Sequence, residues 1–145
     1  MSFVHSSRVS GLAALFEPDS SSWGVNRRGF GVEVRPKDLM DGWVHFAISS
    51  PAVIHRTRLR ANTATIRFAT GPSASIRSLH VWDGDVNMLK QDGLNLRSSN
   101  MENYSVQISG QPEVFYGTEI SILVSFGNRS SDAWVQVASA GIDFS

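Results

Sequence analysis

Apolar and polar residues alternate along most of the chain. In GWVHFAIS, residues 42–49, Val44, Phe46 and Ile48 alternate with other side chains. The same period of two occurs in residues 30–35, 63–69, 78–84, 103–109, 119–127 and 133–139. Because successive side chains of a strand point to opposite faces, this period predicts about eight to ten strands with one apolar face each. The segment SGLAALFEP has room for one helical turn, but a strand is the preferred prediction there.

Turn-forming residues separate the apolar segments. Asp83-Gly84, between apolar flanks, is the strongest hairpin signal, since type I′ turns need positive φ at both central residues. Strands with one apolar and one polar face are typical of antiparallel sheets that pack face to face. The sequence therefore predicts an all-β fold, a single antiparallel β-sandwich over residues 1–145, jelly-roll-like or immunoglobulin-like. The C-terminal strand, residues 134–144, is expected inside a sheet.

Composition narrows the range of functions. The chain has 145 residues, which suits one domain, and its 13 basic and 13 acidic residues give no net charge. We therefore expect neither nucleic acid nor a membrane as a partner. There is no cysteine, which excludes disulfides and thiolate chemistry. The first residues lack the pattern of a signal peptide, so a cytoplasmic location is expected.

Several short motifs occur in a characteristic order: HSSRVSG, GWVHFAI, LHVWDG, DGLNL and SAGIDF. This order resembles a family of small bacterial and fungal all-β proteins that is a domain of unknown function. The likeness runs from His5 to Phe144. The resemblance implies an all-β domain, and it supplies no catalytic residues.

Two aromatic pairs lie on the less aliphatic side of their strands. Trp43 and His45 are two residues apart, as are His80 and Trp82, so the side chains of each pair point the same way. Indoles stack on apolar C–H surfaces and imidazoles hydrogen-bond hydroxyls, while Asp83 at the strand end can accept further hydrogen bonds. We predict these five as ligand-binding residues for a carbohydrate or another small polar or aromatic ligand. The alternative is a face buried beneath a loop or another subunit.

Metal and catalytic motifs are weak. His45, His80 and Asp83 have ligand chemistry but no metal-site spacing, and the segment 83–93 does not match a twelve-residue calcium loop. No Gly-x-Ser-x-Gly elbow is present, and nothing in the sequence brings a serine, a histidine and a carboxylate together. We therefore predict no catalytic residues, no metal and no cofactor.

The leading interpretation is a non-enzymatic cytosolic binding or self-assembling module, lectin-like in its ligand. Zero net charge and outward tryptophans favour a homo-oligomer, most simply a twofold dimer. One alternative is a small-molecule enzyme that uses His45 or His80 as acid or base in an apolar pocket. Another is a structural homo-oligomer or filament subunit, in which Trp43 and Trp82 anchor an interface.

Overall fold

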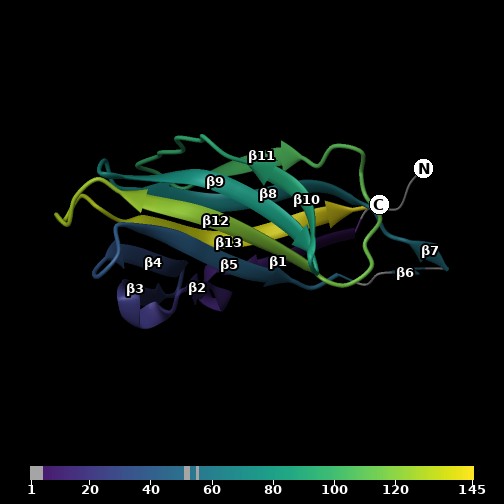
Figure 1. Ribbon diagram of the computed structural model, residues 1–145, viewed down its shortest axis with the longest axis horizontal. Coiled ribbons are helices and arrows are strands. Elements are labelled where there is room, and N and C mark those ends of the chain that lie inside the picture. Colours follow the sequence, from purple (N-terminus) through teal and green to yellow (C-terminus); the bar gives the residue numbers. More distant parts are fainter. Residues whose placement is uncertain (1–4, 51–52, 55) are drawn as a thin grey trace.

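A computed structural model describes residues 5–50, 53–54 and 56–145. Two antiparallel sheets pack against each other (Figure 1). The six-stranded sheet has the order β11 (Glu102–Gln107), β8 (Ala61–Thr70), β13 (Val135–Phe144), β4 (Gly31–Pro36) and β3 (Trp23–Arg28), with β1 (His5–Ser10) also paired to β13. The five-stranded sheet has the order β10 (Val86–Gln91), β9 (Ala74–Asp83), β12 (Thr118–Phe126), β5 (Asp41–Ile48) and β2 (Leu15–Glu17). A small ribbon, β6 (Val53–Ile54) with β7 (Thr57–Arg58), extends from one end (Figure 1).

The core lies between the two sheets and confirms the predicted alternation. The side chains of Val44, Phe46 and Ile48 are buried on β5. On the other long strands the buried set includes Ala64, Ile66, Phe68, Leu79, Val81, Ile120, Ile122, Val124, Val135, Val137, Ala140 and Ile142. Phe30 departs from the pattern and is exposed, because β4 begins only at Gly31. The antiparallel β-sandwich is therefore confirmed.

The connections decide between the two predicted topologies. The chain changes sheet from β4 to β5, from β8 to β9, from β11 to β12 and from β12 to β13. The immunoglobulin fold also crosses between sheets, but the strand orders here, β4–β13–β8–β11 in one sheet and β5–β12–β9–β10 in the other, are those of a jelly roll. One consequence is that β12, late in the chain, lies between β5 and β9.

The predicted hairpin forms between β9 and β10, but its turn is displaced by one residue. Asp83 pairs with Val86, so the two loop residues are Gly84 and Asp85. Gly84 has a φ of 58°, whereas Asp85 is not among the residues with positive φ. Glycine with positive φ at the first loop position is typical of a type II′ turn, not of the type I′ turn that the sequence suggested.

The segment SGLAALFEP contains a short helical turn followed by the strand β2. Gly11–Ala13 form a 3-10 turn, which the Ser10 side chain caps by accepting a hydrogen bond from the Leu12 N–H at 3.1 Å. A second 3-10 turn spans Ser20–Ser22. Within the described part of the chain, no helix has the length and apolar character to cross a membrane.

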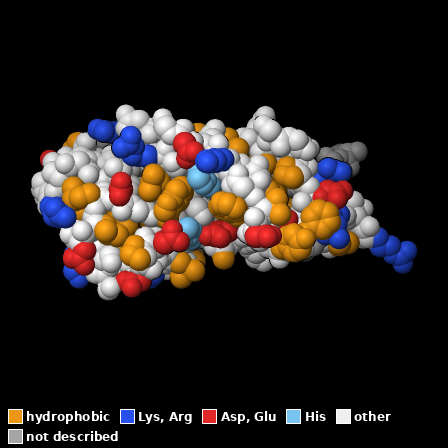
Figure 2. All heavy atoms as spheres, in the orientation of Figure 1, with side chains coloured by type: hydrophobic (Ala, Val, Ile, Leu, Met, Phe, Trp, Pro, Cys, Tyr) orange, Lys and Arg blue, Asp and Glu red, His pale blue; other side chains and the backbone are white. Residues whose placement is uncertain are grey.

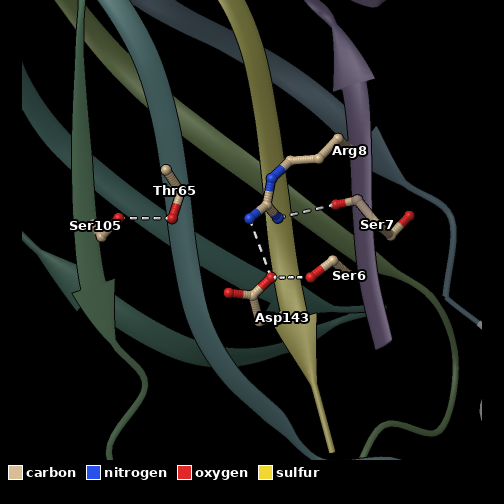
Figure 3. Close-up of polar contacts among 6 residues, drawn as sticks. All are labelled: Ser6, Ser7, Arg8, Thr65, Ser105 and Asp143. Carbon is tan, nitrogen blue, oxygen red and sulfur yellow. Dashed lines mark hydrogen bonds and ion pairs between the residues drawn. The ribbon is translucent and has the colours of Figure 1, made fainter. Parts of the chain in front are cut away.

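The outer faces of the two sheets differ in chemistry. On the six-stranded sheet, the hydroxyls of Thr65 and Ser105 are hydrogen-bonded at 2.8 Å, and Arg8 forms an ion pair with Asp143 at 3.0 Å (Figure 3). Small and charged side chains therefore cover this face. The outer face of the five-stranded sheet presents histidine, acidic and hydrophobic side chains instead (Figure 2). This second face carries the candidate site.

Candidate functional site

A solvent-open groove of about 620 Å³ crosses the outer face of the five-stranded sheet. Strands β2, β5, β9 and β12 contribute to it, together with the β9–β10 turn. Its lining residues are Glu17, Trp43, His45, His80, Trp82, Gly84, Asp85, Glu119 and Ser121. Figure 2 shows histidine side chains among hydrophobic and acidic ones in the middle of this face. Four of the five residues predicted as ligand-binding thus meet in one groove.

The strand carrying Ser121 separates the two aromatic pairs. In the sheet register, Ser121 lies opposite His45 on β5 and opposite His80 on β9. The pairs nevertheless touch, because the ring of Trp43 reaches across β12. The centroids of the Trp43 and His80 rings are 4.8 Å apart, with an angle of 48° between the planes. This contact fixes the indole of Trp43 at the base of the groove.

His45 lies in a network of acceptors. Its Nδ1 atom is 2.8 Å from Glu119 Oε1 and 2.7 Å from Ser121 Oγ, and the Ser121 hydroxyl donates to Glu119 Oε1 at 3.2 Å. An ionised carboxylate has only acceptors, so Nδ1 is the nitrogen that carries a proton. The other nitrogen, Nε2, lies 3.7 Å from Glu17 Oε1. His45 thus lies between two carboxylates that line the groove, with Nδ1 toward Glu119 and Nε2 toward Glu17.

His80 is held from the other edge of the sheet, by a residue that follows β10. Its Nε2 atom is 2.8 Å from Asp92 Oδ1, and the Ser78 hydroxyl donates to the same oxygen at 2.8 Å. The hydrogen bond from His80, followed by that from Ser78, lowers the pKa of Asp92 below its usual value. The His80 ring is therefore oriented by Asp92 while it contacts the ring of Trp43.

Asp83 does not line the groove. It is 2% exposed, and its carboxylate accepts hydrogen bonds from three backbone N–H groups. Phe115 donates to Oδ2 at 2.8 Å, while Tyr116 and Gly117 donate to Oδ1, each at 2.9 Å. The alternation that points Trp82 outward points Asp83 inward. Asp85, two residues on, supplies the carboxylate at this edge of the groove.

The groove brings a serine, a histidine and carboxylates together, which the sequence did not indicate. Ser121 is only 2% exposed, beneath His45 and Glu119, and its hydroxyl donates to Glu119. A nucleophilic serine must reach a substrate carbonyl while its proton passes to histidine. The Ser121 hydroxyl is committed to Glu119 and covered, so this arrangement is a structural network. In the described residues, no group of three or more histidine, cysteine or acidic residues is placed to hold a metal ion.

Sequence reasoning missed Glu17, Asp85, Glu119 and Ser121. Glu119 and Ser121 alternate with the buried Ile120 and Ile122, which marks them as outward residues of a strand. This alternation shows on which face of the sheet the two residues lie, but not which residues of other strands lie next to them. Only the jelly-roll order, which inserts β12 between β5 and β9, brings them to His45 and His80.

Comparison with known proteins gives a family and a fold. A model of the family of unknown function DUF6623 matches residues 18–145. This match confirms the resemblance to a domain of unknown function. No curated protein matches the sequence.

Several solved structures share the architecture at low sequence identity. A xylan-binding module of family CBM86 from Roseburia intestinalis has a TM-score of 0.58 at 14% identity, over 97% of this chain and 96% of that one. The C-terminal CBM6 module of a laminarinase from Zobellia galactanivorans has a TM-score of 0.53 at 12% identity, over 95% and 98% of the two chains. A family 35 carbohydrate-binding module from Clostridium thermocellum has a TM-score of 0.53 at 11% identity, over 95% and 97%. At these identities the likeness establishes the β-sandwich fold.

Proposed function

The chain belongs to the family of unknown function DUF6623, and we propose, from its groove, that it is a non-enzymatic carbohydrate-binding module. The observation that carries this proposal is the groove itself, in which two indoles, two imidazoles and three carboxylates converge on one sheet face. The shared fold with xylan-binding and other carbohydrate-binding modules supports it.

The groove offers both kinds of contact that a sugar ring needs. Trp43 and Trp82 are half-buried, so each indole has one part fixed by packing and one part in contact with solvent. An indole face held in this way stacks on the C–H face of a pyranose ring without losing side-chain freedom. The Trp43 ring is further fixed by His80.

Polar groups lie beside the indoles. Glu119 and Asp85 present carboxylate oxygens that accept hydrogen bonds from sugar hydroxyls. His45 Nε2 adds a site that accepts a hydrogen bond when the ring is neutral and donates one when it is protonated. Several acceptors beside a stacking surface favour a ligand rich in hydroxyl groups over an apolar one.

The other interpretations receive less support. The enzyme alternative places an acid–base histidine in an apolar pocket, whereas this groove is open and contains three carboxylates. An interface anchored by Trp43 and Trp82 would bury those same carboxylates against a partner, and buried unpaired charges are unfavourable. The homo-oligomer stays a prediction from the sequence.

Binding is tested by isothermal titration calorimetry against soluble xylan, laminarin and mannan. We expect one of these glycans to bind wild type, and Trp43→Ala to weaken that binding by about tenfold, or about 1.4 kcal/mol. Phe30→Ala, which removes an exposed aromatic side chain from the turn between β3 and β4, is the matched control and should bind as wild type does. If no glycan binds wild type, or if Trp43→Ala binds equally well, the proposal fails.

A further inference from the structure

Two large aromatic side chains are exposed just beyond the groove. Phe115 and Tyr116, in the connection between β11 and β12, have 50% and 73% of their surface exposed, and their ring centroids lie 6.1 Å apart. Figure 2 shows hydrophobic side chains beyond the acidic ones, toward the end from which β6 and β7 extend in Figure 1. Adjacent exposed aromatic residues are uncommon on soluble domains and mark contact surfaces. We refer to Phe115 and Tyr116 as the aromatic shelf.

The aromatic shelf is fixed from beneath. The buried Asp83 carboxylate accepts the N–H groups of both shelf residues and of Gly117. The guanidinium of Arg58 lies 4.1 Å from the centroid of the Phe115 ring, and its Nη1 atom donates to the Val114 carbonyl at 2.8 Å. A loop tied at its backbone and at one ring loses little freedom when a ligand binds, which favours affinity.

The shelf is continuous with the groove. Gly84 lines the groove, and a Cβ atom at this glycine would lie 2.9 Å from Tyr116 Cβ, so the tyrosine packs directly against the groove edge. Gly84 also donates its N–H to the Gly117 carbonyl at 2.8 Å. A neighbouring hollow of about 640 Å³ shares His45 and Glu119 with the groove and is lined by Gly117. The second hollow therefore reaches the loop that carries Tyr116, and the groove reaches Gly84, which packs against Tyr116.

We propose that Tyr116 is a further sugar-stacking residue, beyond Trp43 and Trp82, so that the site takes a linear glycan chain and not a single terminal sugar. This inference rests on the proposed function. The glycan runs from the indoles of Trp43 and Trp82 past Gly84 and onto the Tyr116 ring. In this arrangement Asp83 is a positioning residue, because it acts on the ligand only through the backbone of the shelf.

The test compares ligands of different length. Titration calorimetry with xylobiose and xylohexaose, or with the corresponding pair from whichever glycan binds wild type, gives the gain in affinity from the longer chain. We expect wild type to bind the hexasaccharide at least tenfold more tightly than the disaccharide. Tyr116→Ala should weaken binding of the hexasaccharide by about tenfold, or about 1.4 kcal/mol, and leave binding of the disaccharide unchanged. Tyr116→Phe keeps the ring and should bind both ligands as wild type does.

The outcomes separate this inference from the proposed function. If wild type binds the hexasaccharide and Tyr116→Ala binds it equally well, the distal subsite is refuted while the carbohydrate-binding function stands. If Tyr116→Ala weakens both lengths equally, the tyrosine acts on the groove itself and the subsite is again refuted. If wild type binds neither length of any glycan, both proposals fail together. Because Tyr116 is largely exposed, its substitution should leave the thermal midpoint unchanged, which near-ultraviolet circular dichroism checks.

Discussion

The three backbone hydrogen bonds to Asp83 predict a large loss of stability when this carboxylate is removed. The donors Phe115, Tyr116 and Gly117 lie 2.8–2.9 Å from its oxygens, and the carboxylate is buried. Hydrogen bonds to a charged acceptor contribute about 1.5–3 kcal/mol each, so the three have an upper bound of about 9 kcal/mol. The donor residues are themselves exposed, and water can replace part of the lost acceptor. We therefore expect Asp83→Ala to lower the free energy of unfolding by about 3 kcal/mol.

Asp83→Asn should be less damaging, by about half. The amide oxygen can still accept the two N–H groups that Oδ1 accepts now, whereas the amide NH₂ would oppose the Phe115 N–H. Urea unfolding followed by tryptophan fluorescence gives these values, with an unchanged dependence on urea as the sign that only stability has altered. Asp85→Ala, in the same turn, is the control and should change stability by less than about 0.5 kcal/mol. A loss from Asp83→Ala as small as that of the control would refute the anchoring role.

Three further predictions concern the groove and its surroundings. Hydrogen bonds from His80 and Ser78 lower the pKa of Asp92 in the folded protein. The stability that this carboxylate contributes is therefore present above its unfolded pKa of about 3.9 and is lost as pH falls through the lower folded pKa. The difference in urea midpoint between wild type and Asp92→Asn should disappear in that acidic range. The three groove carboxylates should repel uronic-acid oligosaccharides, and Glu119→Gln should relieve part of that repulsion, most clearly at low salt in titration calorimetry. Light scattering coupled to size exclusion should give Trp82→Ala the same mass as wild type; a smaller mass for the variant would make the groove an interface.

The fold was predictable because its main determinant is local. On a two-layer sandwich each strand has one face in the core, and the period of two therefore runs through the sequence at Val44, Phe46 and Ile48 and at their counterparts on the other strands. The exceptions occur at strand ends. Phe30 lies in a turn, and the hairpin loop is Gly84-Asp85, because the pairing register and not the dipeptide decides which residues remain unpaired.

The site was only half predictable, for a physical reason. Trp43, His45, His80 and Trp82 are recognisable as outward residues from their own strands. Their partners are not, since Glu119 and Ser121 lie far along the chain and reach the groove only through the position of β12 between β5 and β9. Strand order depends on packing between distant segments, and periodicity within one segment carries no information about it.

Asp83 shows how the alternation within one strand and the packing of distant segments act together. Its position directly after Trp82 made it a candidate acceptor for a ligand, but neighbouring residues on a strand point to opposite faces, and Asp83 is buried, with its carboxylate bound to the backbone of residues 115–117. The same carboxylate then fixes Tyr116, an exposed ring at the edge of the groove. A residue that the sequence proposed as a direct ligand contact therefore reaches the ligand indirectly, by holding the backbone of the residue that makes the contact. We therefore expect Asp83 substitutions to weaken the binding of long glycans and to leave the binding of short glycans unchanged.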